Sequence, residues 1–317
     1  MLALVSSTQA QKQYEFTVAP ATGQHFGDTR FRLNFLYLLP DSSIGSGGSE
    51  LVFPLDATFD GLELGFRYWK DGHQLWTGNL RAIHSITEPR SNMMDEDWDN
   101  VGQVRLLWSH TDSETDATLA ELNIEATRLV AWGKSAELAV VAGVGLQKFK
   151  FRMTDLTGWQ YLDLDSNGQT EVYVVDENVV AGTYETRYLR PEIGLMPRLL
   201  ADPFVVEFKA VVSPLLYTKD VDDHLLRFFQ IHTNGRGFGY GGRIAVEYNP
   251  RGRGGARFYA RVSGEARGAE IDVSGYREYY ATVNAGGQII YSGTRFAEQH
   301  VVNTTQYGVH FSIGLSF

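Results

Sequence analysis

The C-terminal segment Tyr307–Phe317 alternates without interruption between apolar residues and residues that are small or polar. Its apolar positions are Tyr307, Val309, Phe311, Ile313, Leu315 and Phe317. A period of two predicts a β-strand with one apolar face. The length is about that of a tilted strand that crosses a bilayer within a barrel. The segment therefore predicts a strand of an outer-membrane barrel.

Other segments alternate in the same way. They lie at Phe31–Leu39, Leu62–Tyr68, Leu122–Ala126, Leu138–Leu146, Val206–Val212, Ile244–Tyr248 and Phe258–Val262. Charged residues stand on the opposite faces, among them Glu63, Arg67, Glu125, Glu207 and Arg261. Such positions would be costly to bury in a soluble sandwich, whereas in a barrel they can pair within the lumen. We therefore expect an all-β fold, an antiparallel transmembrane β-barrel of about ten strands.

Between these rows lie polar segments of two kinds. Asp71-Gly72 and Asn249-Pro250-Arg251-Gly252 have the composition of short turns. We expect longer, acidic loops at Asp41–Ser49, Thr87–Asn100, Thr154–Ala181, Lys219–Asp223 and Glu265–Tyr276. Short turns at one end and long loops at the other are typical of outer-membrane barrels.

Composition agrees with a barrel and excludes several classes of function. Hydrophobic residues make up 43 % of the 317 residues and the mean hydropathy is −0.22, with no run near the roughly 18 apolar residues of a transmembrane helix. The absence of Cys excludes thiol catalysis, thiolate metal sites and disulfides. A net charge of −10 argues against a nucleic-acid partner and favours cationic ones.

The N-terminus resembles the end of a secretory signal. Met1–Ala10 has a short apolar patch followed by small residues that end in Ala, without a basic segment before them. An ordinary frayed terminus is the alternative. We expect residues 11–317 to form a single barrel domain, because the sequence contains no linker, repeat or low-complexity segment.

Two short motifs place titratable residues at positions i and i+2. Asp95 and Asp97 lie within Asn92-Met93-Met94-Asp95-Glu96-Asp97-Trp98, and Asp222 and His224 end the segment Asp220–His224. In an extended chain each pair points to one side. Two close carboxylates raise one pKa, and a carboxylate beside an imidazole orients a general base. Together the pairs could activate a water, although such clusters are also common as solvated surface or as Ca²⁺ or Mg²⁺ ligands.

The order of these motifs resembles the omptin family of outer-membrane endopeptidases. Asn92–Trp98 is similar to the family's Asn-Met-x-Asp-x-Asp-Trp segment, and Asp220–His224 is similar to its Asp-x-Asp-x-His segment. Tyr184–Leu195 is similar to a Tyr-x-x-Arg-aromatic-x-x-Pro-x-Ile-Gly-Leu strand. The resemblance extends from about Ser49 to the C-terminus, although the Ser/His pattern after Trp108 is displaced.

The resemblance implies a ten-stranded barrel with an active-site groove at its extracellular end. Asp222 and His224 would activate a water, which Asp95 and Asp97 would bind while stabilising the tetrahedral intermediate. Asp220 matches an acid that helps to bind a basic side chain of the substrate. The implied function is hydrolysis of peptide bonds at basic sites in cationic peptides or proteins.

The family also requires lipopolysaccharide, which basic residues bind on the outer face of the barrel. By resemblance, Arg187 is one of these, and Lys150 stands where a second is expected, with Lys in place of Arg. The alternative for both is snorkelling at the membrane interface. We expect no metal and no cofactor other than this activating lipid.

One departure leaves the basic-site preference open. The family's first-strand acid has no clear match, since Phe31–Leu39 contains no carboxylate and Glu50 is a weak candidate. A non-catalytic barrel that acts as an adhesin or binds host proteins is therefore the main alternative. A small-solute channel is disfavoured because paired lumen charges would close it, and a metalloenzyme because the sequence lacks an HExxH-type cluster.

Overall fold

The computed structural model describes residues 14–38, 44–70, 73–86, 90–101, 103–161, 171–248, 256–285 and 288–317. Almost all of these residues lie in strands. The strands are β1 (Tyr14–Leu38), β2 (Ile44–Pro54), β3 (Ala57–Lys70), β4 (His73–Ser85), β5 (Arg90–Val101), β6 (Val104–Trp132), β7 (Ala136–Gln160), β8 (Glu171–Val174), β9 (Gly182–Ala201), β10 (Phe204–His224), β11 (Phe229–Tyr248), β12 (Arg257–Tyr279), β13 (Val283–Ala285), β14 (Gln288–Ile290) and β15 (Arg295–Ser316). Within the described ranges, the helical element is the 3-10 turn Leu225–Arg227, and no helix is long and apolar enough to cross a membrane.

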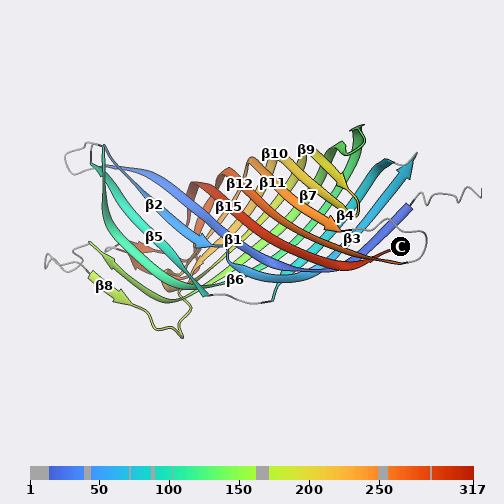
Figure 1. The fold of residues 1–317 in the computed structure, drawn as a ribbon. Coiled ribbons are helices and arrows are strands. Elements are labelled where there is room, and N and C mark those ends of the chain that lie inside the picture. Colours follow the sequence, from blue (N-terminus) through green and yellow to red (C-terminus); the bar gives the residue numbers. More distant parts are fainter. Residues whose placement is uncertain are drawn as a thin grey trace, which may run out of the picture.

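Ten of the described strands close a ring (Figure 1). Each pairs antiparallel with the next in the order β1, β3, β4, β6, β7, β9, β10, β11, β12 and β15, and β15 pairs back to β1. Closure leaves no unpaired edge in the ring. The antiparallel barrel of about ten strands that the sequence predicted is therefore confirmed.

Strands β2 and β5 continue the ring beyond β3 and β4. β2 pairs with β1 from Asp28 onwards, and β5 bridges β2 and β6. The transition lies at Gly27, where the carbonyl accepts the amide of Leu55 at 3.0 Å. Gly27 has a φ of +131°, and a Cβ there would lie 2.0 Å from the carbonyl oxygen of Thr305, so only glycine fits. We call the end formed by β2, β5 and β8 the far end, and the opposite end, where the described chain begins and ends, the near end (Figure 1).

The longer acidic segments are mostly strands, which corrects the loops expected from sequence. Their described parts fall within β2, β5, the end of β7, β8, the end of β10 and β12. The remaining residues of these segments lie outside the described ranges or in short connections. The signal-like segment Met1–Ala10 also lies outside the described ranges. Pattern reasoning missed these strands because the outer face of the far end is polar, so alternation with lipid-facing apolar residues is lost there.

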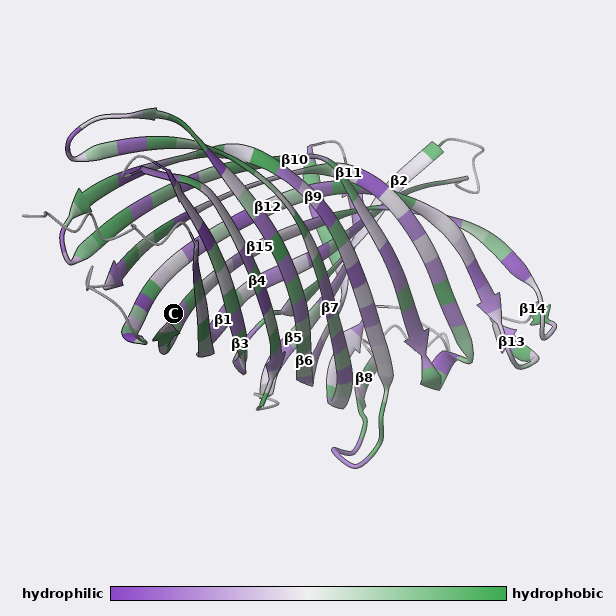
Figure 2. Ribbon diagram, turned by 90° about the vertical axis from the view of Figure 1, so that its right-hand side faces the viewer, coloured by the Kyte–Doolittle hydropathy of each residue, from purple (hydrophilic) through white to green (hydrophobic). Residues whose placement is uncertain are grey.

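Apolar and polar residues alternate along the strands (Figure 2), and around the near half many of the apolar side chains are exposed. The exposed residues include Phe16, Leu62, Ile124, Val144, Ile193, Phe208, Ile244, Val262 and Phe311. In the C-terminal strand Tyr307, Phe311 and Phe317 are exposed, whereas His310, Ser312 and Ser316 are buried, as the alternation predicted. A continuous apolar belt of this kind is the lipid-facing surface of a membrane barrel.

The apolar face reverses beyond Gly27. Phe31 points into the barrel and packs edge-on against Tyr184 at 4.5 Å between ring centroids, while Arg30 and Arg32 are on the exposed face. The row Phe31–Leu39 therefore does not continue the lipid-facing surface, contrary to its appearance in the sequence. At the far end the interior needs an apolar core, which Phe53, Phe149 and neighbouring residues supply.

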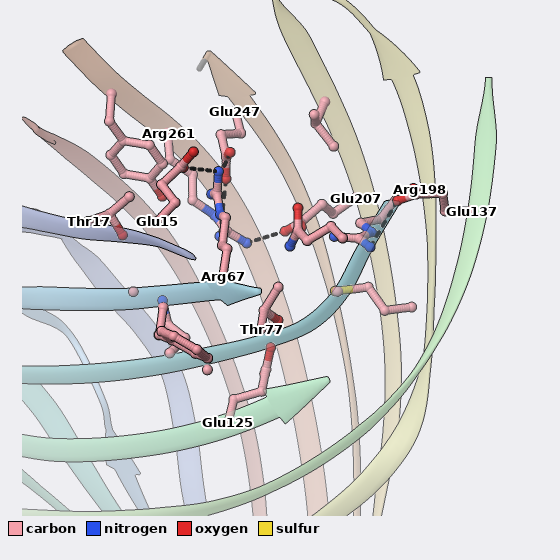
Figure 3. Close-up of a pocket in the computed structure, with 18 of the residues that line it drawn as sticks. Glu15, Thr17, Arg67, Thr77, Glu125, Glu137, Arg198, Glu207, Glu247 and Arg261 are labelled. Carbon is pink, nitrogen blue, oxygen red and sulfur yellow. Dashed lines mark hydrogen bonds and ion pairs between the residues drawn. The ribbon is translucent and has the colours of Figure 1, made fainter. Parts of the chain in front are cut away.

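The lumen of the near half is filled by ion pairs. At its near end Arg67 binds Glu15 at 3.1 Å and Glu247 at 2.6 Å, and Arg261 binds Glu207 (Figure 3). The inward charges expected from the alternating pattern therefore do pair. Each charge is compensated within the lumen, as burial requires.

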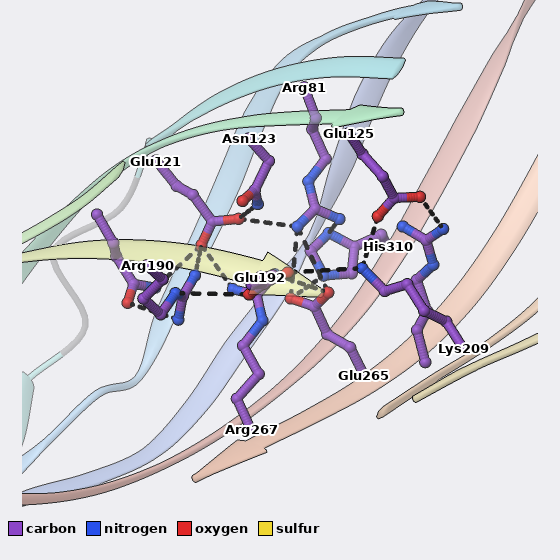
Figure 4. A network of polar contacts seen from close by, with 12 residues as sticks. Arg81, Glu121, Asn123, Glu125, Arg190, Glu192, Lys209, Glu265, Arg267 and His310 are labelled. Carbon is purple, nitrogen blue, oxygen red and sulfur yellow. Dashed lines mark hydrogen bonds and ion pairs between the residues drawn. The ribbon is translucent and has the colours of Figure 1, made fainter. Parts of the chain in front are cut away.

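A second network crosses the middle of the lumen (Figure 4). Glu121 accepts hydrogen bonds from Arg81 at 2.8 Å, Arg267 at 3.1 Å and Gln147 at 3.0 Å. Lys209 reaches Glu125 at 2.7 Å. These side chains come from strands around the whole ring and tie its walls together below the far end.

Candidate functional site

The end of β10 presents Asp222 and His224 to the interior. The strand remains paired with β9 through Asp223 and with β11 through His224, so the chain is still extended at this motif. The Nε2–H of His224 donates to Oδ2 of Asp222 at 2.9 Å, and the imidazole packs against Phe229 at 4.4 Å between centroids. With the proton on Nε2, Nδ1 is the basic nitrogen of the ring.

Asp95 and Asp97 lie on the inner face of β5, which is paired with β2 and β6. The Oγ–H of Ser49 donates to Oδ1 of Asp95 at 3.4 Å, and Ser49 and Ser109 flank Asp97 on the neighbouring strands. Burial, and next the charge of Asp97, raise the pKa of Asp95 to about 7. Burial also raises the pKa of Asp97. The pair can therefore retain a proton near neutral pH.

The two motifs meet around two cavities. One, of about 270 Å³, is lined by Asp95, Asp97, Asp220, Asp222 and His224 among others, and we call it the Asp220 cavity. The other, of about 280 Å³, is lined by Asp95, Asp222, His224 and a group of apolar residues that includes Met153, and we call it the Met153 cavity. The lining residues shared by the two cavities are Leu51, Asp95, Asp222, His224 and Arg227. The candidate catalytic groups therefore lie at the boundary between two pockets.

Asp220 lies deep in its cavity and is 3 % exposed. It accepts hydrogen bonds from the hydroxyls of Tyr184 at 3.0 Å, Thr218 at 3.1 Å and Thr233 at 3.5 Å. Burial raises its pKa to about 6, against the effect of these donors. Three fixed donors hold the carboxylate in place at the bottom of the Asp220 cavity.

The same cavity contains charged residues that sequence reasoning missed. Arg277 pairs with Glu298 at 3.3 Å and lies over the ring of Phe229 at 4.7 Å. His300 stands beside Phe31 at 5.1 Å between centroids, and burial lowers its pKa to about 4. Glu298 and His300 continue the inward positions of the C-terminal strand, so its period of two was the signal that could have found them.

Glu50, the weak first-strand candidate, does not line the Asp220 cavity. It pairs with Arg30 at 3.7 Å and Arg32 at 3.3 Å. On β1 the cavity is lined by Phe31, Leu33 and Phe35, so Asp220 has no carboxylate facing it from this strand.

Lys150 and Arg187 lie on the outer face, apart from both cavities. Lys150 on β7 and Arg187 on β9 are exposed, and Arg187 donates from Nε to Glu185 at 2.7 Å. The residue opposite Arg187 in the β7 ladder is Lys148, whereas Lys150 is opposite Glu185. Among the described residues, no group of three or more His, Cys, Asp or Glu could hold a metal ion.

Comparison with known proteins places the chain in a family. The sequence model of the Omptin family matches residues 68–263. The crystal structure of outer membrane protease OmpT from Escherichia coli is 13 % identical, with a TM-score of 0.69, and the match covers 97 % of this chain and 99 % of that one.

A second structure and the curated proteins were also compared with this chain. The outer-membrane-expressed OmpT of Vibrio cholerae is 12 % identical over 92 % of this chain and 98 % of that one, with a TM-score of 0.13. No curated protein matches the sequence significantly. From the family match and the shared barrel, the chain belongs to the omptin family of outer-membrane proteases.

Proposed function

We propose that this protein is an outer-membrane endopeptidase that hydrolyses peptide bonds with a water activated by Asp222 and His224. The observation that carries the proposal is that Asp95, Asp222 and His224, from two separate strands, line both cavities of the far end. A base, its orienting carboxylate and a proton-holding acid pair therefore surround one position where a carbonyl could lie.

The reaction needs one base and one acid. Nδ1 of His224 removes a proton from the water, whose oxygen then attacks the carbonyl carbon of the substrate. The proton retained by Asp95 and Asp97 is donated to the developing oxyanion, which stabilises the tetrahedral intermediate. The imidazolium, whose charge Asp222 stabilises, then passes its proton to the leaving nitrogen as the C–N bond breaks. As the carbonyl re-forms, the hydroxyl of the intermediate returns its proton to Asp95 and Asp97, which restores the acid pair.

A basic side chain is the substrate feature that fits the Asp220 cavity. The aromatic and aliphatic wall formed by Phe31, Leu33 and Ile231 can hold the methylene stem of Arg or Lys, and Asp220 at the bottom can hold its charge. A bound cation would also favour the ionised form of Asp220. The acidic net charge of the chain would steer cationic peptides toward it.

Lipopolysaccharide is the proposed activating lipid, held by basic residues above the apolar belt. Arg187 and Lys150 are supported by their exposed positions, and Lys148, Lys219 and Arg236 project on the same side from β7, β10 and β11. Arg236 lies 5.3 Å from the ring of Tyr217 on the neighbouring strand. A row of cations at a membrane interface suits the phosphates of a lipid headgroup.

We also propose that the far end faces outside the cell. Both ends of the described chain are at the near end, where β3 ends at Lys70 and β4 begins at His73, and bacterial barrels place their short turns in the periplasm. The two cavities would then be open to extracellular substrates, and the lipopolysaccharide row would lie in the outer leaflet.

The test is cleavage of a mixed library of quenched peptides containing Arg and Lys by the refolded chain, with and without lipopolysaccharide. We expect lipid-dependent cleavage that His224→Ala abolishes. His232→Ala is the matched control, since His232 is on the adjacent strand, packs on Tyr276 at 5.2 Å and lines neither cavity. If folded, lipid-bound protein cleaves nothing, or if His224→Ala cleaves equally well, the proposal is wrong, and retained binding of the peptides would favour a non-catalytic barrel.

A further inference from the structure

The Met153 cavity differs in chemistry from the Asp220 cavity. Apart from the five shared residues, its lining is dominated by apolar side chains, including Met93, Met153, Leu156, Val175 and Leu226. Gly182 is opposite Met153 in the β7–β9 ladder, and a Cβ at Gly182 would lie 2.8 Å from the Met153 methyl carbon. The cavity is therefore a mostly apolar pocket next to the candidate catalytic groups.

The Met153 cavity has no carboxylate in its described lining that is available to bind a basic side chain. The hydroxyls of Thr111 and Tyr173 bond to each other, and Gln160 is neutral. Within the described part of the chain, its carboxylates are Asp95 and Asp222, which the proposed mechanism occupies with the water and with His224. Arg227 lines both cavities, so the difference between them is that the Asp220 cavity adds the carboxylates of Asp97, Asp220 and Glu298 and the Met153 cavity adds none among the described residues.

We infer that the two cavities receive the side chains on opposite sides of the cleaved bond, so that the preferred site joins one basic residue to one aliphatic residue. This inference rests on the proposed function. The basic side chain enters the Asp220 cavity, and a Leu-, Met- or Val-like side chain enters the Met153 cavity. A pair of basic residues would leave one cation without a free carboxylate in an apolar pocket, which is costly.

The experiment compares quenched peptides that differ only in the central pair: Arg-Leu, Leu-Arg, Arg-Arg and Leu-Leu. The refolded full chain is used with lipopolysaccharide, and fragment masses identify the cleaved bond. We expect one of the two mixed peptides to be cleaved between its central residues about tenfold faster than Arg-Arg, since an apolar pocket discriminates on this scale.

Variants then test which pocket is responsible. Met153→Asp supplies a carboxylate and should reverse the preference toward Arg-Arg, whereas Met153→Leu should preserve it. Leu156→Asp, at a partly exposed position of the same lining, serves if Met153→Asp does not fold. The matched control is Val174→Asp, since Val174 is 71 % exposed on β8 and lies outside the lining of the cavity.

Two outcomes would overturn the inference while leaving the protease intact. One is cleavage of Arg-Arg by the wild type at least as fast as of the mixed peptides. The other is an unchanged preference in both Asp variants. Cleavage of no peptide, or cleavage that survives His224→Ala, would instead remove the proposed function and this inference with it.

Discussion

Asp95 lies on β5 and His224 on β10, strands that do not pair with each other, yet both side chains line each of the two cavities at the far end. Asp222 raises the pKa of Asp95, whereas Arg227 and His224 lower it. The position between these strands is therefore where a water and a carbonyl group would meet a base and a proton donor.

The hydrogen bond from His224 to Asp222 gives the first prediction. Asp222→Asn should lower kcat about a hundredfold or more with a small effect on KM, because the imidazole loses the group that orients it and stabilises its charge. Steady-state kinetics on a cleaved peptide measures this. Asp223→Asn is the matched control, since Asp223 binds Gln230 and Tyr280 instead. Equal loss in both variants would contradict the role of Asp222.

Asp95 gives a prediction about stability and pH. Its pKa is raised from 3.8 to about 7, so its contribution to folding is fully present below pH 3.8 and is lost as the pH rises through about 7. The rise corresponds to at most about 4 kcal/mol, and to less because the side chain is partly open to water in the cavity. Unfolding temperatures in detergent from pH 4 to pH 8 should therefore fall less steeply in Asp95→Asn. An identical slope in the wild type and the variant would count against this assignment.

Asp220 is predicted to act on substrate choice rather than on chemistry. Asp220→Asn should reduce kcat/KM for an Arg peptide about a hundredfold, because a buried charge-assisted contact is lost. A matched peptide with norleucine in place of Arg should be cleaved about as fast as by the wild type. If both peptides lose activity equally, Asp220 supports the fold of the site and not its specificity.

The outer basic row is predicted to set the response to lipopolysaccharide. Replacing Arg187 and Lys219 together by Ala should raise the lipid concentration for half-maximal activity about tenfold, since charged contacts to phosphates are removed. Arg30→Ala is the control, because Arg30 is also exposed and paired with Asp28 but lies on β1. An unchanged lipid requirement in the double variant would show that the lipid binds elsewhere.

The network in the middle of the lumen is predicted to support the barrel. Glu121→Ala should destabilise it by about 3–5 kcal/mol, because the buried cations Arg81 and Arg267 would then share the single carboxylate of Glu265. The unfolding temperature should fall clearly, whereas Glu270→Ala, at an exposed position, should leave it unchanged. Planar-bilayer recordings of the wild type should show no steady conductance, and a stable open current would contradict a closed lumen.

Much of the barrel was predictable because alternation is a local property. Tyr307–Phe317 and the charges at Glu207 and Arg261 needed no knowledge of their partners, since neighbouring residues of a strand always point to opposite faces. The same rule brought Asp222 and His224 to one side. It failed for Lys219–Asp223 and for the described part of Thr87–Asn100, which were expected to be loops and are strands, because strands that leave the lipid no longer alternate with apolar residues.

The sequence by itself determined the strand period, the charged lumen and the two pairs of candidate catalytic residues. Only the tertiary structure decided that β5 and β10 bring those pairs to one place and that Phe31 turns inward. It also decided that Arg277 and Glu298 line the Asp220 cavity and that Met153 lines the second cavity. The reason is physical: a side chain's direction depends on its own strand, whereas its neighbours depend on register between strands distant in sequence, which closure of the ring imposes.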